Sequence, residues 1–301
     1  MTSAQLQAFI TVAKANSFTS AAILLGISQS AVSHAIKSLE EELGVALFVR
    51  SKADIALTAV GENILSKAHQ ILGLYESIRQ ESHETKNLQT GVLKIASFGP
   101  SFSARILPLI LKEYHQQYPN IKVHVEEAQD SVVKQWVANR KVDLGSIVLP
   151  DSDLDHIYLT TDQVFIILPK GHSLSKKSEI QIQDLTDFPF ILTEGTSGNM
   201  VMELFKKSQL QPNIIYYNMQ IMSMLAMVSH GAGISATAEL AIPPLEADGV
   251  SAFELKSLKP VLKREIGLAM HNIHALSPAA KAFVKTSSKL QREGKFKFSG
   301  C

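Results

Sequence analysis

Residues 17–43, SFTSAAILLGISQSAVSHAIKSLEEEL, constrain the fold of this chain more than any other stretch. Gly26 divides the stretch into two short helical patterns, and glycine suits the left-handed residue that ends a helix. In the second pattern, apolar residues recur at steps of three and four, which predicts one buried stripe. The stripe consists of Val32, Ile36, Leu39 and Leu43. A helix held by such a stripe, with a short polar face left outward, is typical of DNA recognition.

The flanking residues extend this pair of helices into a small domain. An amphipathic helix is predicted over residues 4–15. Ser17 and Ser28 are suited to cap the next two helices, because their hydroxyls can accept free backbone amides. After Gly44, the segment ALFVRSKADIALT alternates in the manner of a two-stranded wing with its tip near residues 52–54.

Residues 59–87 follow Thr58 and are predicted to form one long helix. Apolar side chains within it recur at heptad spacing, which predicts a seam for another helix. They are Ile64, Ala68, Ile71, Tyr75 and Ile78. The alternative is an amphipathic helix that packs only on its own domain. We favour pairing between two chains, because the segment lies between domains.

Strand and helix patterns alternate from about residue 91 onward, which predicts open α/β sheets with mainly parallel strands. The remaining length is enough for two subdomains, and ligands of such sheets bind in a crevice beyond the strand ends. Apolar residues make up 46% of the chain, which is ample for buried cores.

Charge and cysteine content exclude several classes of protein. The net charge of +1 offers no global field for nucleic acid, and the single cysteine, Cys301, excludes a disulfide framework within one chain. The opening MTSAQLQAF lacks the pattern of a signal peptide, and no apolar run is long enough to span a membrane. We therefore expect a soluble, cytoplasmic protein that does not enter a membrane.

The whole chain resembles the LysR-type transcriptional regulators. The N-terminal match is carried by Phe9, Ala13, Ser17, Phe18, Ala21, Ala22, Leu25, Ser28, Gln29, Ala31, Val32, Ser33, Ile36, Leu39, Glu40, Leu43, Gly44, Leu47, Phe48, Arg50, Leu57, Thr58 and Gly61. The resemblance implies an all-α winged helix-turn-helix domain over 1–58 and a dimerising linker helix over 59–90. It also implies a two-lobed α/β effector domain over 91–301, similar to periplasmic binding proteins. We place lobe I at 91–163 and 266–301 and lobe II at 164–265, and expect a homodimer or homotetramer.

The sequence departs from the family pattern in two places. Ser30 stands where the family usually has proline, and the wing carries Lys52 but also Asp54. Residues 1–58 contain four basic and four acidic side chains, so this domain is formally neutral. We therefore expect modest DNA affinity per domain, with useful binding achieved by linking several domains on one DNA.

Candidate contacts to double-stranded DNA lie on the polar face of the second helix and on the wing. Gln29 can bond an adenine edge twice, and Ser33 is small enough for close approach. The full set is Ser28, Gln29, Ser30, Ser33, His34, Lys37, Arg50 and Lys52. The alternative for each is an ordinary solvated residue. The expected operator is a two-fold repeated site.

Candidate effector contacts begin in the segment KIASFGPSFSARILP, which leads from a strand into a helix. Gly99 permits close approach, and Ser101 sits where free amides could hold an anion, typically a carboxylate. The resemblance implies that this loop, Ser131 and the turn 193–197 face one crevice. The full set is Ser97, Phe98, Gly99, Ser101, Phe102, Ser131, Thr193, Thr196 and Gln220. A simple capped turn remains the alternative, and Phe98 and Phe102 could be core residues.

The sequence contains no pattern of a metal, cofactor or catalytic site. His271 and His274 are three residues apart but have no third ligand nearby in the sequence. No nucleophile elbow or phosphate-binding loop occurs, so we expect no enzyme. The absence of paired cysteines argues against the peroxide-sensing branch of the family. A solute-binding protein without a DNA role is the main rival, and residues 1–58 oppose it.

Overall fold

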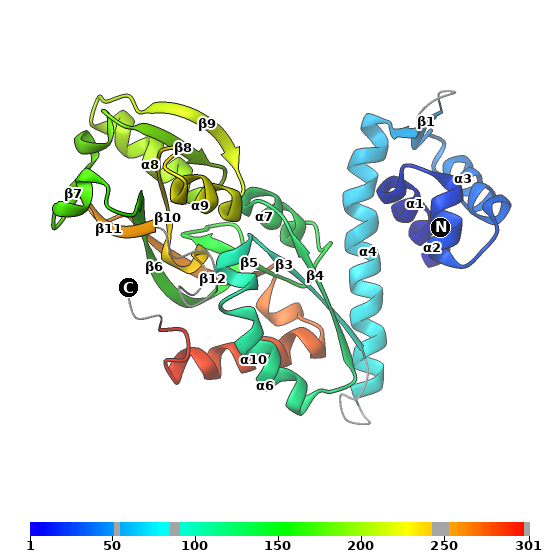
Figure 1. Cartoon of the computed structure of the whole chain (residues 1–301). Coiled ribbons are helices and arrows are strands. Elements are labelled where there is room, and N and C mark those ends of the chain that lie inside the picture. The colour runs from blue at the N-terminus through cyan, green and yellow to red at the C-terminus, as the bar shows by residue number, and fades with distance from the viewer. Residues whose placement is uncertain (51–54, 85–90, 243–252, 298–301) are drawn as a thin grey trace.

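The computed structural model describes residues 1–50, 55–84, 91–242 and 253–297. The chain forms a small N-terminal helical domain, one long helix and an α/β domain with two lobes (Figure 1). None of the helices in these ranges is long and apolar enough to cross a membrane.

The N-terminal domain contains α1 (Ser3–Ala15), α2 (Phe18–Leu25) and α3 (Gln29–Leu43), followed by the antiparallel strands β1 (Phe48–Arg50) and β2 (Ile55–Leu57). The caps follow the sequence: the Ser17 hydroxyl accepts the Ser20 amide, and the Ser28 hydroxyl accepts the Ala31 amide. Gly26 and Gly44 end α2 and α3 in the left-handed conformation. The predicted wing tip lies outside the described residues.

The predicted stripe of α3 forms the centre of this domain, with one exception. Val32, Ile36 and Leu39 are fully buried, whereas Leu43 is exposed because α3 ends there and extends past the core. The Phe9 and Phe48 rings meet edge to face, with centroids 5.5 Å apart. The apolar face of α3 is therefore used within the chain, which leaves its polar face outward.

Helix α4 (Ala59–Glu84) begins after Thr58, whose hydroxyl accepts the Gly61 amide. The predicted seam divides into two parts. Ala68 is 1% exposed and belongs to the core of the N-terminal domain, and Ile64 packs against the same core. The prediction that Ala68 faces another chain is therefore wrong, because its own domain already covers it. The exposed part of the predicted seam consists of Ile71, Tyr75 and Ile78, and Leu74, which was not predicted, is exposed beside them; we call these four residues the α4 stripe.

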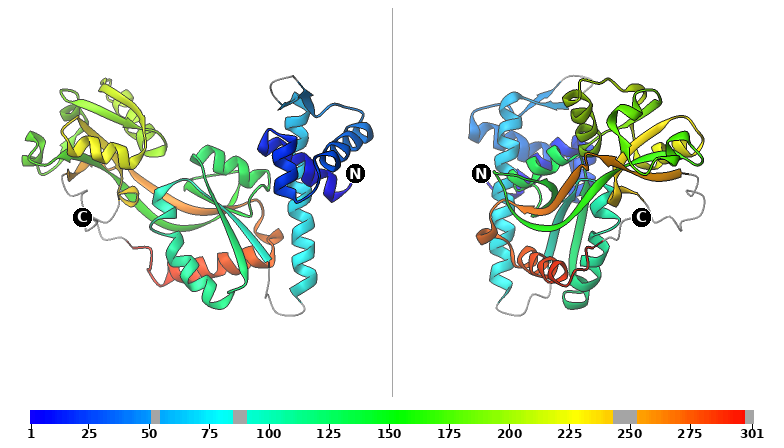
Figure 2. Two further views of the ribbon diagram at one scale, coloured as in Figure 1. Left: turned by 45° about the vertical axis from the view of Figure 1, so that its right-hand side comes forward. Right: turned by 90° about the vertical axis from the view of Figure 1, so that its left-hand side faces the viewer.

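Helix α4 also lies against the α/β domain (Figures 1 and 2). The Ser66 hydroxyl donates to the Asn139 side-chain oxygen at 2.7 Å. Lys14 of α1 forms an ion pair of 3.3 Å with Glu126 of strand β4 (Ile121–Glu127). The N-terminal domain and α4 thus rest on the first lobe of the same chain.

Lobe I contains the sheet β4-β3-β5-β12-β6, with β3 at Gly91–Ser97, β5 at Leu144–Leu149, β12 at Lys263–Met270 and β6 at Asp155–Pro169. Strands β4, β3 and β5 are parallel, but β12 is antiparallel to both neighbours, so the sheet is mixed. Helices α6 (Leu107–Gln117) and α10 (Pro278–Arg292) cover one face, and α7 (Asp130–Ala138) covers the other. The short helix α5 (Pro100–Ser103) follows β3.

Lobe II is built around three strands that are parallel to one another, β10 (Ile234–Ala238), β8 (Pro189–Thr193) and β9 (Asn213–Met219). Strand β10 pairs with the end of β6 in the antiparallel direction. Strands β11 (Phe253–Lys259) and β7 (Ile180–Gln181) extend it, and α8 (Thr196–Lys207) and α9 (Ile221–Ser229) cover its faces. Short 3-10 turns lie at Ser173–Lys176, Ile182–Leu185, Glu239–Ala241 and Ile273–Ala275.

Strand β6 and the short segment between β11 and β12 connect the lobes. Strand β6 pairs in lobe I up to Gln163 and in lobe II from Val164, at the predicted boundary. Strand β12 joins the lobe I sheet from Lys263, ahead of the predicted boundary at residue 266. Because β6 continues from one lobe into the other and β12 begins beside it, side chains at this junction contact both lobes.

Candidate DNA-reading helix and ligand pocket

The first turn of α3 presents a small polar surface. The hydroxyls of Ser28 and Ser30 lie 2.9 Å apart and form a hydrogen bond. The Gln29 amide nitrogen donates to the Ser33 hydroxyl at 3.3 Å. The set of exposed side chains is Ser28, Gln29, Ser30, His34 and Lys37, and Ser33 is half-buried beside them. All six predicted α3 residues therefore occupy one outward face.

Charge on this face is sparse. Lys37 lies 3.7 Å from Glu41 one turn along the helix, which partly cancels its charge. Arg50 is the last residue of β1, so the wing backbone carries it, while Lys52 lies outside the described residues. Hydroxyls and one amide dominate the surface, and such groups can donate to phosphates or base edges.

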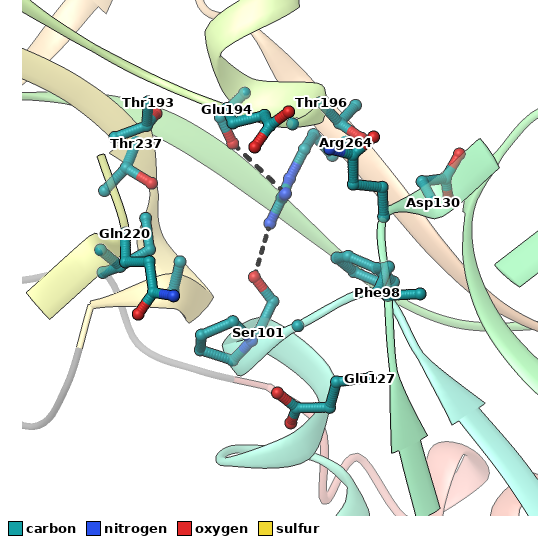
Figure 3. Close-up of a pocket in the computed structure, with 18 of the residues that line it drawn as sticks. Phe98, Ser101, Glu127, Asp130, Thr193, Glu194, Thr196, Gln220, Thr237 and Arg264 are labelled. Carbon is teal, nitrogen blue, oxygen red and sulfur yellow. Dashed lines mark hydrogen bonds between the residues drawn. The ribbon is translucent and has the colours of Figure 1, made fainter. Parts of the chain in front are cut away.

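A cavity of about 410 Å³ lies between the two lobes of the α/β domain (Figure 3). The loop after β3 and the start of α7 line it from lobe I, and the starts of α8 and α9 line it from lobe II. Free backbone amides at the starts of helices make such places favourable for polar and anionic groups. The cavity thus lies where the sequence predicts a crevice.

Six of the predicted effector residues line this cavity: Phe98, Gly99, Ser101, Thr193, Thr196 and Gln220. Three predicted residues do not, and each has a physical reason. Ser97 is fully buried and bonds the Gly99 backbone and the Ser103 hydroxyl. Phe102 is in the lobe I core, so only Phe98 forms an aromatic wall. Ser131 is exposed outside the cavity, and Asp130 lines the cavity in its place.

Sequence reasoning missed several lining residues, above all Arg264. The sequence signal for Arg264 is a basic residue in the charged segment 263–265 ahead of the apolar run of β12, and this pattern also fits an ordinary exposed strand end. Ser197 belongs to the predicted turn but not to the predicted set, and Glu127 and Glu194 lie outside that set as well. Met222 also lines the cavity, whereas Met224 is buried in the core.

Arg264 lies on the floor of the cavity and is almost fully buried. Two of its nitrogens donate to the Asp162 carboxylate, at 2.9 and 2.6 Å. Its other hydrogen bonds reach Ser101 in lobe I, at 3.2 Å, and Ser197 in lobe II, at 3.3 Å. Burial and the nearby Asp162 raise the pKa of Glu239, which follows β10 beside this pair.

The cavity wall is otherwise acidic. Asp130 accepts the Val148 amide at 2.8 Å and pairs with Lys134 at 3.2 Å. Glu127 and Glu194 are exposed at the cavity and have no basic partner within the described ranges. Those ranges also contain no group of three or more side chains that could hold a metal ion. The cavity is therefore suited to an organic molecule. Hydrogen-bond donors on the cavity floor and acceptors on the cavity walls would orient that molecule.

Both parts of the chain match known protein families. Residues 3–62 match the family described as "Bacterial regulatory helix-turn-helix protein, lysR family", and residues 86–290 match the "LysR substrate binding domain". The uncharacterized HTH-type transcriptional regulator YvbU of Bacillus subtilis is 30% identical, with 96% of this chain and 99% of that protein covered. The probable HTH-type transcriptional regulator LrrA of Synechococcus elongatus is 33% identical, with 93% and 94% covered.

Solved structures share the fold over nearly the full length. A full-length OxyR variant of Pseudomonas aeruginosa superposes with a TM-score of 0.74 at 25% identity, covering 97% of this chain and 95% of that one. CbnR in complex with its target DNA superposes with a TM-score of 0.66 at 22% identity, covering 96% and 99%. The chain therefore belongs to the LysR family of transcriptional regulators, in which a DNA-binding helix-turn-helix domain is joined to a domain that binds a small-molecule effector.

Proposed function

We propose that this protein acts in the cytoplasm and binds a two-fold repeated operator with one α3 helix in each major groove. The supporting observation is the division of α3 into a fully buried face and an outward polar face. The contacts would come from Ser28, Gln29, Ser30, Ser33, His34 and Lys37 on α3 and from Arg50 and Lys52 on the wing. Gln29 is the strongest candidate for base readout, because a glutamine amide can bond adenine twice.

Stable binding would require more than one copy of the chain. The N-terminal domain is formally neutral, so few counterions are released when one copy binds DNA. The α4 stripe leaves Ile71, Leu74, Tyr75 and Ile78 exposed on a helix that connects the two functional parts. Pairing of two such stripes would bury them and hold two α3 helices on one operator, which raises the effective concentration of the second.

The effector would bind in the cavity between the lobes. It could shift the protein only by binding one arrangement of the lobes more tightly than another. Because α4 and α1 contact lobe I, a change between the lobes could reach the DNA-binding helices through that contact. No conversion of the ligand is part of this proposal, and turnover of any bound compound would contradict it.

Fluorescence anisotropy with a duplex from the region upstream of the gene tests the DNA role. Gln29→Ala should weaken binding to the specific duplex by about tenfold or more, because a bidentate base contact contributes roughly 1–3 kcal/mol. Gln7→Ala removes an equally exposed glutamine from α1 and is the matched control. Equal affinity of both variants and the unmodified protein would contradict the assignment of α3 as the reading helix.

A further inference from the structure

Arg264 lies at the start of β12, beside the point where β6 leaves lobe I for lobe II. It stands directly opposite Asp162 in the antiparallel register of β12 and β6. The two side chains are only 4% and 2% exposed, and Asp162 also accepts the Leu240 amide at 3.3 Å. The pair is thus held from several sides, and the two charges cancel one another.

The outer nitrogens of this guanidinium bond one serine from each lobe. One nitrogen donates to Ser101 of α5 at 3.2 Å (Figure 3). The other donates to Ser197 of α8 at 3.3 Å. A guanidinium carries five N–H groups, and the bonds to Asp162 and the two serines use four of them. Within the described residues, one N–H on the nitrogen that bonds Ser197 is left over.

Among the residues that the structure describes, the two serine hydroxyls have no acceptor for their protons. Each oxygen accepts from Arg264, so its own proton must point elsewhere. Ser101 is 3% exposed and Ser197 is 7% exposed, and neither proton has an acceptor within the described residues. A buried donor left unpaired is costly, and both residues line the cavity. The cavity floor therefore offers two O–H donors and one N–H donor, which suits a group that only accepts hydrogen bonds.

The charge around this floor limits how much negative charge a ligand can carry. Asp162 balances the charge of Arg264. Lys134 balances the charge of Asp130, but Lys134 itself does not line the cavity. Glu127 and Glu194 face the same space. A second negative charge on the ligand would lie close to these carboxylates, and like charges in contact are strongly disfavoured. The described lining residues include no unbalanced cation that could offset this repulsion.

We propose, on the basis of the function proposed above, that the effector is a small monocarboxylate. Its carboxylate would accept the hydroxyl protons of Ser101 and Ser197 over Arg264, so that one group of the ligand is bonded by both lobes. The rest of the ligand would be neutral or positively charged, as in an amino acid. Arg264 acts as a positioning residue that orients the two hydroxyls.

Thermal-shift screening and then calorimetry of the full chain test this proposal. The probes are aliphatic and aromatic monocarboxylates and L-amino acids, each with its carboxamide, together with dicarboxylates, inorganic phosphate and sulfate. Binding is expected only for monocarboxylates, and the matching carboxamide should not bind. Ser101→Ala and Ser197→Ala should each weaken the best compound by about 10- to 100-fold, the range for a hydrogen bond to a charged group.

Ser103→Ala is the matched control, because Ser103 bonds Ser97 at 2.7 Å outside the cavity lining and should leave affinity unchanged. Arg264 itself is left intact, because its removal would strip a buried carboxylate of its partner and endanger the fold. The proposal is overturned if no monocarboxylate binds, if a dianion or carboxamide binds equally well, or if both serine variants keep full affinity. Failure of the proposed function would appear separately, as loss of specific DNA binding by the unmodified protein.

Discussion

Replacing Ile78 by serine should separate the chains of an oligomer held by the α4 stripe. Ile78 is 65% exposed in one chain. Full burial of an isoleucine contributes roughly 1.5–3 kcal/mol, so burying the exposed part contributes about 1–2 kcal/mol per chain. Two-fold symmetry places the residue in the interface twice, so the loss is about 2–4 kcal/mol per dimer. The dissociation constant should therefore rise by about 30- to 700-fold.

Sedimentation velocity over a dilution series measures this change. Ile23→Ser is the matched control, because Ile23 is 77% exposed on α2 and lies outside the stripe. The control should keep the dissociation constant of the unmodified protein. An Ile78→Ser protein that dissociates no more readily than the Ile23→Ser protein would show that the exposed seam of α4 does not pair.

Three further predictions concern the core, the charge pair and the contact between domains. Ile36→Ala should cost about 2–5 kcal/mol, because Ile36 is fully buried, and hydrogen exchange should show lost protection in α1–α3; unchanged exchange would contradict this. Asp162→Asn should release the Arg264 charge at a cost in stability, so calorimetry below the melting temperature of this variant should show dicarboxylates gaining affinity relative to monocarboxylates. Burial, with Lys141, Lys94 and Lys14 nearby, lowers the pKa of His69 to about 4 despite the opposing effect of Glu126. The folded chain thus favours neutral His69. The free energy of unfolding therefore has its full contribution from His69 above pH 6.5 and loses it as the pH falls from 6.5 toward 4. Lower protection factors in α4, which correct amide exchange for its intrinsic dependence on pH, are expected at about pH 5 than at about pH 7.5, and His69→Gln should abolish this difference.

The N-terminal domain could be predicted closely because its signals are local. Ser17, Gly26, Ser28 and Gly44 mark helix ends by their own hydrogen bonds and backbone preferences. The heptad seam could be predicted only in part. Periodicity shows that Ala68 and Ile78 lie on one face, but it does not show that the N-terminal domain covers the first and leaves the second exposed.

The cavity could be located from the sequence, but its chemistry could not. Helix starts and loops predict where a ligand can bind, so Ser101, Thr196 and Gln220 could be predicted as lining residues. The role of Arg264 depends on the register that sets it against Asp162, far away in the sequence. The sequence also does not show which way a single side chain points, since Phe98 faces the cavity while Phe102 faces the core.

The two connections between the lobes, β6 and the segment that leads into β12, have a consequence for synthesis of the chain. Lobe II is inserted within lobe I, so the lobe I sheet stays incomplete until β12 and then α10 have been made. The helix-turn-helix domain is complete far earlier, and at about 5–20 residues per second the interval is on the order of 10–40 s. During that time a nascent chain has its DNA-reading helix but no finished ligand cavity. Chains released early would therefore carry the helix-turn-helix domain without the cavity through which an effector could control it.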